Sequence, residues 1–296
     1  MKRITVTICG LLMLTAPLAL ADTFVHVETR MGAMDFQLFD DLAPITVANF
    51  LNYVNDGDFD GTFIHRSVPG FVIQGGGFLY DPSVAVPGDP PIVNEFDPAT
   101  MSNIRGTLAM ARGTDLDSAT SQWFINLVDN DMLDDPANPY CVFGAVIKGM
   151  VAVADEIALL PVEDMSIVHS AFSTLPMINY TPAGPSEPFN PILEENLAMV
   201  FSVSVFTPRQ GDANLDDYVG PLDYMAWTSG YGPGANGKYW DNGDFTGDGI
   251  VDGLDYIALS NNYQQGTPPT PANVPEPASA LVLALGLFFV RRRQRA

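Results

Sequence analysis

The stretch from residue 63 to residue 77 carries one arginine and one glutamine in largely apolar surroundings. It reads Phe-Ile-His-Arg-Ser-Val-Pro-Gly-Phe-Val-Ile-Gln-Gly-Gly-Gly, so that Arg66 and Gln74 stand on either side of a Pro-Gly turn. This pattern predicts two strands that are joined by the turn and followed by a glycine run. A guanidinium in apolar surroundings needs acceptors for its five N–H donors. Taken alone, Arg66 is therefore either a satisfied structural charge or a group directed at a ligand.

The whole stretch resembles the central signature of the cyclophilin family of peptidyl-prolyl isomerases, F-H-R-x-x-P-G-F-x-I-Q-G-G. Ile64 stands between the first two signature positions, and the other matching residues are Phe63, Arg66, Pro69, Gly70, Phe71, Ile73, Gln74, Gly75 and Gly76. The resemblance implies that Arg66 is the catalytic arginine. It also implies that Phe71 and Gln74 line a cleft that binds proline.

Other segments resemble the same family, namely 38–50, 121–127, 132–134 and 140–144. They imply a catalytic set of Arg66, Phe71, Gln74 and Phe124. They also imply a substrate-binding set in which Met110 and Leu133 complete the prolyl pocket. In this set Gln122 and the backbone at Ala111 hold the flanking peptide, and Tyr140 closes the rim. Met132 stands where many members have Trp or Phe. Because methionine is flexible, we expect a softer pocket wall at this position.

These residue types suit the rotation of an X-Pro amide bond. The barrier of about 18–20 kcal/mol arises from resonance between the nitrogen lone pair and the carbonyl. A guanidinium that donates toward the prolyl nitrogen binds the twisted amide better than the planar one, because the twisted nitrogen is the better acceptor. Arg66 fits this role, since it is always charged. The chemistry requires no cofactor.

The elements around these residues follow from hydrophobic periodicity. Residues 24–39 alternate as a hairpin, a helix begins at Pro44 and ends before Gly57, a second helix spans 148–160, and 198–207 alternates as a closing strand. The family resemblance implies that residues 22–207 form a mainly β domain, a closed eight-stranded antiparallel barrel capped by two helices. Residues 161–197 carry few periodic signals.

Residues 212–231 and 244–263 repeat each other with a spacing of 32 positions. Each repeat places oxygen ligands at positions 1, 3, 5, 7 and 12 of a loop that enters a helix, which is the spacing that wraps Ca²⁺. The repeats resemble a dockerin pair over 208–266, which implies structural Ca²⁺ and a cohesin-type partner. Two acidic turns without metal remain the alternative. The expected ligands are Asp212, Asn214, Asp216, Tyr218 and Asp223 in the first loop, and Asp244, Thr246, Asp248, Ile250 and Asp255 in the second.

Both ends of the chain carry targeting patterns. Residues 1–21 have a basic start, an apolar run and the small residues of a signal peptide cleaved after Ala21. Residues 267–296 form a Pro-rich linker and a segment with Pro-Glu-Pro, an apolar run and three arginines, which resembles a PEP-CTERM sorting signal. The resemblance implies processing by an exosortase after transient anchoring in the inner membrane. An uncleaved anchor at the first end and a simple tail anchor at the second remain alternatives.

Composition limits the partners. Thirteen Lys and Arg against 35 Asp and Glu give a net charge of −22, which disfavours nucleic acid. Cys9 lies in the leader, so Cys141 has no partner for a disulfide after processing. We therefore predict a peptidyl-prolyl cis-trans isomerase that acts on exported or cell-envelope proteins of a Gram-negative-type bacterium, in the periplasm or at the surface. The alternatives are a non-catalytic envelope protein that binds proline loops and a calcium-dependent scaffold component.

Overall fold

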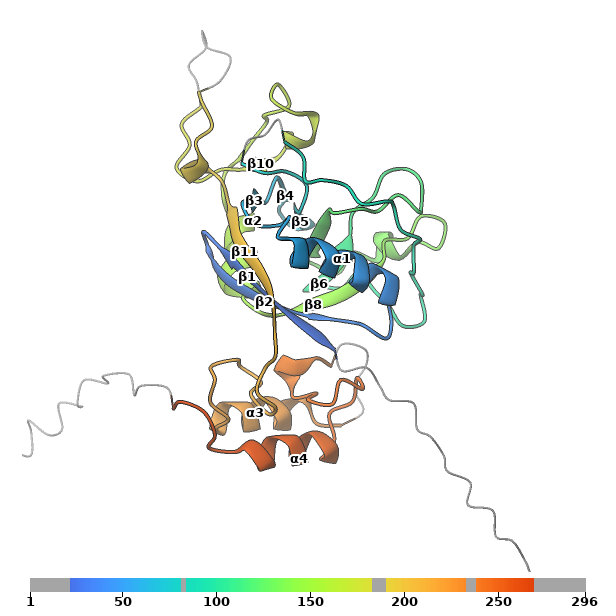
Figure 1. The fold of residues 1–296 in the computed structure, drawn as a ribbon, viewed down its shortest axis with the longest axis vertical. Coiled ribbons are helices and arrows are strands. Elements are labelled where there is room, and N and C mark those ends of the chain that lie inside the picture. Colours follow the sequence, from blue (N-terminus) through green and yellow to red (C-terminus); the bar gives the residue numbers. More distant parts are fainter. Residues whose placement is uncertain (1–21, 81–83, 183–189, 233–237, 269–296) are drawn as a thin grey trace, which may run out of the picture.

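The computed structural model describes residues 22–80, 84–182, 190–232 and 238–268. These residues form a curled β-sheet domain and a smaller helical module beneath it (Figure 1). The predicted signal peptide at 1–21 and nearly all of the predicted sorting tail lie outside the described residues. None of the described helices is long and apolar enough to cross a membrane.

Within the described residues, nine strands make one antiparallel sheet in the order β3-β11-β1-β2-β8-β6-β7-β5-β4. Each strand therefore runs in the opposite direction to the strands beside it, and the sheet curls around an apolar core. The strands are β1 (Thr23–Thr29), β2 (Gly32–Leu38), β3 (Thr62–Phe63), β4 (Arg66–Val68), β5 (Val72–Gly75), β6 (Thr107–Met110), β7 (Trp123–Asn126), β8 (Val142–Lys148) and β11 (Met199–Phe206).

The predicted closed eight-stranded barrel is wrong in strand number and in closure. The order of strands in the described sheet has two ends, β3 and β4, which do not pair with each other. Both ends nevertheless belong to one continuous segment: Phe63 pairs with β11, and Arg66 pairs with β5. The segment changes partner at Ile64 and His65, whose N–H groups donate to Ala198 and Gln74 respectively. The sheet edges are thus joined through the backbone instead of through a strand ladder.

The two predicted capping helices are present in the described chain. Helix α1 (Pro44–Asp56) begins with proline in its first turn, and its C-cap Gly57 adopts the left-handed φ of 75° that glycine tolerates. Val47, Phe50 and Tyr53 on its inner face are buried in the core. The second helical segment comprises a π-helical turn over 150–154 followed by α2 (Asp155–Ala158), which is shorter than the predicted 148–160.

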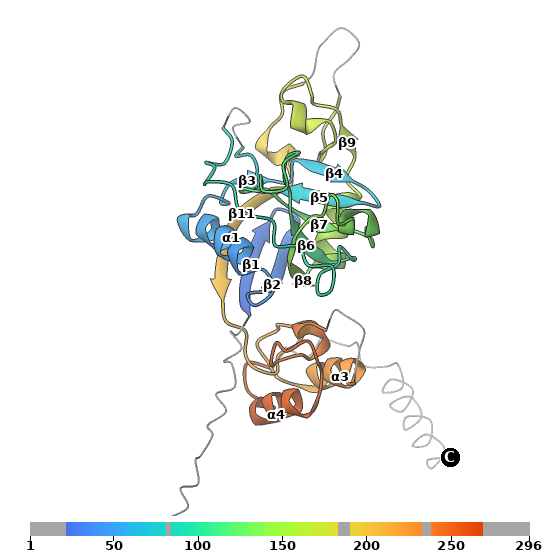
Figure 2. The same cartoon turned by 90° about the vertical axis from the view of Figure 1, so that its right-hand side faces the viewer.

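The segment after α2 packs over the β4 edge of the sheet. It contains the short strands β9 (Val162–Glu163) and β10 (Leu175–Pro176), and it buries its own apolar cluster around Phe172, Leu175 and Met177. The N–H of Ser67 donates to the carbonyl of Thr174, so the extension satisfies part of the free edge of β4. In Figure 2 it lies at the end of the sheet domain that is opposite the helical module.

The helical module contains α3 (Pro221–Gly230) and α4 (Gly253–Asn262), as the repeats predicted. It packs against the β1, β2 and β8 side of the sheet domain through a third apolar cluster. The indole ring of Trp240 lies 4.9 Å from the ring of Phe24, edge to face, and its backbone N–H donates to Gln37 Oε1 at 2.8 Å. Lys148 Nζ donates to the carbonyl of Leu215 at 2.6 Å. The helical module is therefore packed against the sheet domain.

Candidate active site

A cavity of about 170 Å³ opens on the outer face of the sheet, over β4, β5 and β7. Seven of its lining residues are ones that the sequence predicted, and they come from five separate segments of the chain. The described residues that line it are Arg66, Phe71, Val72, Gln74, Ala111, Arg112, Phe124, Leu133 and Tyr140. None of these carries a carboxylate, so no acid neutralises the arginines from within the lining.

Arg66 is positioned by strand pairing. Arg66 on β4 lies directly opposite Gln74 on β5, and Gln74 lies opposite Phe124 on β7. Residues in register across neighbouring strands point to the same face, so these three side chains share one surface. The Nη1 of Arg66 donates to Gln74 Oε1 at 3.3 Å, and Gln74 Nε2 donates to Gln122 Oε1 at 2.8 Å. The two glutamines form a chain that holds the guanidinium.

Phe71 reaches the same face although it is three residues from Gln74, which is not the period of a strand. It precedes β5 and lies in the turn, where Gly70 adopts a φ of 73°. Its carbonyl accepts hydrogen bonds from the N–H of Leu127 and from Asn130 Nδ2 at 3.1 Å. The ring centroid lies 5.9 Å from the guanidinium carbon of Arg66. The turn therefore supplies the bend in the backbone that brings Phe71 and Gln74 to the same face.

Burial sets the charge states behind the cleft. Partial burial lowers the pKa of the Arg66 guanidinium, but the group remains charged at neutral pH. His65, its neighbour in the chain, is buried on the opposite side of the strand, and desolvation lowers its pKa to about 3. A neutral His65 adds no second charge beside Arg66. No carboxylate pairs with Arg66 among the described residues.

The apolar wall is formed by Phe124, Leu133 and Tyr140. Phe124 lies on β7, and its ring meets Tyr140 edge to face at 5.8 Å. Leu133 belongs to a short 3₁₀ helix over 131–134 that turns it inward. Buried Asn103 donates to the carbonyl of Tyr140 at 3.0 Å and to Asp134 Oδ1 at 2.8 Å, so it ties both loops together.

Asn103, Asn126 and Asn130 are supporting residues that sequence reasoning missed. They are all buried and are hydrogen-bonded to one another through Asn126. Buried asparagines are unusual, and three of them close to the motifs are the signal that could have found these residues.

Three predicted substrate-binding residues do not line the cleft. Met110 is 2% exposed and points into the core, where it lines a separate small cavity beside Cys141. Gln122 reaches the cleft through two lining residues: its Oε1 accepts from Gln74 and its carbonyl accepts from the N–H of Ala111. Met132 is 73% exposed and does not line the cavity, so its part in the pocket wall stays a prediction. In the 3₁₀ helix, Leu133 faces inward and Met132 faces solvent.

Two lining residues were not predicted, Val72 and Arg112. Val72 lies between Phe71 and Gln74 in the turn and strand that were already identified. Arg112 follows Ala111, and its guanidinium carbon lies 4.4 Å from the ring centroid of Tyr140. The signal that could have indicated Arg112 is its position directly after Ala111, whose backbone was predicted to bind the substrate.

The acidic loops of the module have matching backbones. Asp217 adopts a φ of 63°, close to the 78° of Gly249 at the same position of the second loop, and it is held by Arg209 at 2.8 Å. The buried carboxylates at position 12 accept backbone N–H groups, Asp223 from Ala213, Asn214 and Gly220, and Asp255 from Phe245, Thr246 and Asp252.

The first carboxylates of the loops are engaged in the same way, Asp212 by Asp216 and Asp217, and Asp244 by Gly247 and Gly249. Asp216 Oδ1 and Asp248 Oδ1 each accept the N–H two residues further on. Throughout the described ranges, no three His, Cys, Asp or Glu side chains form a cluster suited to a metal ion. The structure therefore does not support the predicted Ca²⁺ ligands, which also include Asn214, Tyr218, Thr246 and Ile250.

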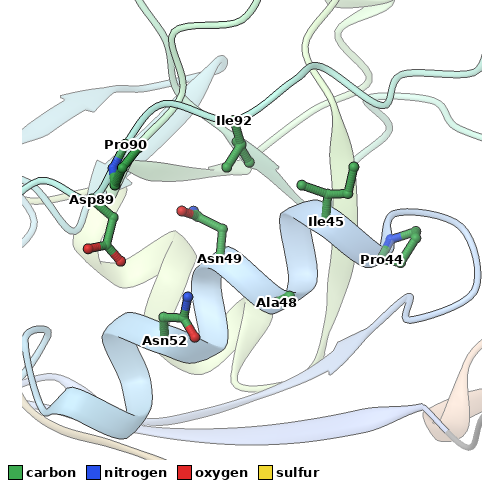
Figure 3. Close-up of a pocket in the computed structure, with 8 residues that line it drawn as sticks. All are labelled: Pro44, Ile45, Ala48, Asn49, Asn52, Asp89, Pro90 and Ile92. Carbon is green, nitrogen blue, oxygen red and sulfur yellow. The ribbon is translucent and has the colours of Figure 1, made fainter.

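A larger hollow, of about 600 Å³, lies on the outer side of α1 (Figure 3). Asn49, Asn52 and Asp89 are the polar side chains that line it, and Asn49 Nδ2 is engaged by the carbonyl of Thr120 at 2.7 Å. The remaining lining is Pro44, Ile45, Ala48, Pro90 and Ile92. Size does not identify the site here, because this hollow holds a single carboxylate and neither a cation nor a nucleophile.

Comparison with known proteins gives a match over the part of the chain that builds the cleft. The family model described as cyclophilin type peptidyl-prolyl cis-trans isomerase/CLD matches residues 24–173. Peptidyl-prolyl cis-trans isomerase A of Dickeya dadantii is 45% identical over 170 residues, which cover 55% of this chain and 88% of that protein. Peptidyl-prolyl cis-trans isomerase B of Escherichia coli is 44% identical over 135 residues, which cover 44% of this chain and 80% of that protein.

A solved structure also matches. It is a cyclophilin type peptidyl-prolyl cis-trans isomerase of Cryptosporidium parvum in the presence of the dipeptide Ala-Pro. The TM-score is 0.45 at 20% sequence identity, and the match covers 62% of this chain and 99% of that chain.

Proposed function

Because this chain belongs to the cyclophilin-type peptidyl-prolyl cis-trans isomerases, we propose that it accelerates the rotation of X-Pro bonds in exported or cell-envelope proteins through Arg66. The observation that carries the proposal is the state of Arg66: it is charged, half-buried and held by one neutral acceptor, Gln74, at 3.3 Å. The described chain offers it no carboxylate. A substrate atom is the acceptor that this guanidinium lacks.

The proposed mechanism uses only groups of the chain and the peptide. The prolyl ring enters the apolar cavity between Phe71, Phe124 and Leu133, where ring burial fixes the proline while the preceding peptide rotates. As the amide twists, its nitrogen becomes an acceptor, and Arg66 donates to it. This bond forms fully only in the transition state, so it lowers the barrier without tightening ground-state binding.

The proposal is tested by measuring cis-trans exchange of a proline tetrapeptide by NMR, with and without the purified protein. Uncatalysed exchange takes tens to hundreds of seconds, so acceleration is easily resolved. We expect acceleration in proportion to protein concentration. Saturable peptide binding without any change in exchange rate would instead support a non-catalytic protein that binds proline loops.

The exported location rests on the sequence of residues 1–21. N-terminal sequencing of the protein from its native host is the direct test, and we expect the mature chain to begin at Asp22. A chain that still begins at Met1 would contradict export by cleavage. The proposed exosortase processing near Pro275 and Pro277 is tested in the same sample, because the mass of the mature protein reports where the C-terminus lies.

We further propose that the helical module docks to a cohesin-type partner. The support is a duplicated apolar surface on α3 and α4, in which equivalent side chains of the two repeats are both exposed. The pairs are Leu222 and Leu254, Tyr224 and Tyr256, Met225 and Ile257, and Tyr231 and Tyr263. Aromatic and aliphatic side chains gathered in this way are typical of a protein interface. Calorimetric titration with a purified cohesin-type domain tests the proposal, and no heat of binding would refute it.

Binding of Ca²⁺ by the two loops stays a proposal based on ligand spacing alone. The test is a thermal unfolding series of EDTA-treated protein with added Ca²⁺. If the loops bind the ion, the melting temperature rises with Ca²⁺ concentration, because a ligand that binds only the native state stabilises it. An unchanged melting temperature up to millimolar Ca²⁺ would leave two acidic turns without metal.

A further inference from the structure

The cations of this acidic protein are distributed unevenly. Six of the thirteen Lys and Arg residues lie at the two ends of the chain, outside the described residues, and seven lie within them. Among those seven, the side chains of Arg30, Arg105, Lys148 and Arg209 each lie within 4.0 Å of a carboxylate. Arg66, Arg112 and Lys238 do not form such a pair with any described residue. Two of these three line the same cleft.

Arg112 is fixed in place without being neutralised. Its Nε and Nη2 donate to the carbonyl of Pro139, at 3.2 and 3.0 Å. Nη2 also donates to Asn138 Oδ1 at 2.7 Å, and Nη1 donates to the carbonyl of Gly113 at 3.0 Å. Four of the five N–H donors are thus engaged by neutral acceptors. The full positive charge remains at the rim, with one donor of Nη1 left over.

Pre-organisation makes this charge useful to a ligand. A free arginine loses side-chain entropy when it forms an ion pair, which is one reason why exposed pairs contribute little. Arg112 is already held by the 138–139 loop and by its contact with Tyr140, so a carboxylate that reaches it meets an ordered partner. Arg112 therefore contributes a fixed positive charge to the lining of the cleft, next to Tyr140.

We propose that Arg112 is a specificity-determining residue that makes the cleft prefer peptides with an acidic residue next to the proline. The inference rests on the proposed isomerase function of this same cleft. The preferred substrate class is Glu-Pro or Asp-Pro, or proline followed by an acid, with the carboxylate lying against the free Nη1 donor.

Exposed acids near Leu133 limit where the acid of the substrate can lie. Leu133 belongs to the 3₁₀ helix over 131–134, which also carries Asp131, and Asp135 follows it. Both acids are exposed, so a substrate carboxylate on this side meets negative charge. The preference is therefore for one acidic residue on the Arg112 side and not for a uniformly acidic peptide. The net charge of −22 adds to this limit at long range, but salt screens it beyond about 8 Å at 0.15 M.

The experiment compares isosteric tetrapeptides by NMR exchange, with Glu or Gln either directly before or directly after the proline. At about 0.15 M salt, we expect kcat/KM to be about two- to fivefold higher for Glu than for Gln at one of these positions, the range of an exposed ion pair. The Gln peptides report the isomerase activity itself. If neither Gln nor Glu peptide is accelerated, the proposed function fails; if both are accelerated equally, only this inference fails.

Three variants distinguish an effect of the Arg112 charge from an effect of Arg112 on the structure of the cleft. Arg112→Gln should lower the Glu to Gln ratio to about one while the protein still accelerates the Gln peptide, because the positive charge that favours Glu is lost. Arg112→Lys keeps the charge and should keep a ratio above one. Arg209→Gln removes the same charge from the exposed pair with Asp217, far along the chain from the cleft, and should leave the ratio unchanged. An equal fall for both peptides in Arg112→Gln would show that Arg112 only positions Tyr140, and would overturn the proposal.

Discussion

Replacement of Arg66 by alanine should separate catalysis from stability. Arg66 makes few structural contacts: one hydrogen bond of 3.3 Å to Gln74 and a distant approach of 5.9 Å to the ring of Phe71. It forms no ion pair with the described residues, and burial lowers its pKa, which shows that the fold gains little from the charge. The arginine is therefore held for a ligand and not for the fold.

The two magnitudes follow from these contacts. Loss of a single long hydrogen bond costs about 0.5–1.5 kcal/mol, partly offset because a half-buried charge is no longer desolvated. Loss of a donor that acts only in the transition state costs about 10²–10³ in rate, by analogy with donors that stabilise developing charge. We expect the free energy of unfolding to fall by less than about 1 kcal/mol and kcat/KM to fall by at least about 100-fold.

Arg105→Ala is the matched control. Arg105 forms two hydrogen bonds to the Asp155 carboxylate, at 3.0 and 2.6 Å, and a third to the carbonyl of Leu127 at 2.6 Å. Its loss should cost about 1–3 kcal/mol of stability and leave kcat/KM largely unchanged. Urea unfolding and NMR exchange measure both quantities on each variant. If Arg66→Ala retains kcat/KM within tenfold of the parent, or loses activity only in step with stability, the assignment of Arg66 is refuted.

Three further outcomes are expected. Leu133→Ala should lower kcat/KM because it enlarges the cleft, whereas Met132→Ala should change it by no more than about twofold, as for other exposed side chains; equal losses would contradict the placement of Met132 outside the cleft. Desolvation lowers the pKa of His65 to about 3, below the unfolded value of about 6.5. The unfolded chain therefore binds a proton that the native state excludes, and stability should fall by roughly 1.4 kcal/mol per unit as pH drops from 6.5 toward 3. Urea unfolding at pH 7 and pH 4.5 should show a smaller fall in His65→Gln, and an identical fall in both proteins would disprove the role of His65. Burial raises the pKa of the Cys141 thiol to about 11, so a chain lacking residues 1–21 should react with a thiol reagent at pH 8 only after denaturation; rapid labelling of the native protein would contradict this burial.

Much of the cleft could be predicted from local sequence. The spacing between Arg66, Pro69, Gly70 and Gln74 already contains the strand, turn and strand that place Arg66 opposite Gln74. A hairpin is a short-range structure, so its register follows from the turn. The first capping helix could equally be predicted, because Pro44, the apolar residues at helical spacing and Gly57 are local signals. The two repeats could also be recognised from the sequence, and they contain α3 and α4.

Two features of the fold lie beyond local sequence. Met132 and Leu133 are neighbours with similar side chains, and only the packing of the 131–134 helix against Asn103 and Tyr140 decides which one faces the cleft. Closure of the barrel likewise depends on where Ile64 and His65 change partner between β11 and β5, which are more than a hundred residues apart in the chain. Such choices are made by long-range contacts that no local pattern encodes.

The sequence by itself determined the motif, the family to which it points and the residues that could carry the chemistry. Tertiary structure decided which of these residues share a surface. It also produced two features that no sequence pattern predicted. One is the packing of the helical module on β1, β2 and β8 through Trp240. The other is the second guanidinium at the cleft, Arg112, whose charge is left without a described carboxylate while its donors are held by the 138–139 loop. The physical reason is that a charge state depends on every neighbour in space, whereas a sequence lists only the neighbours in the chain.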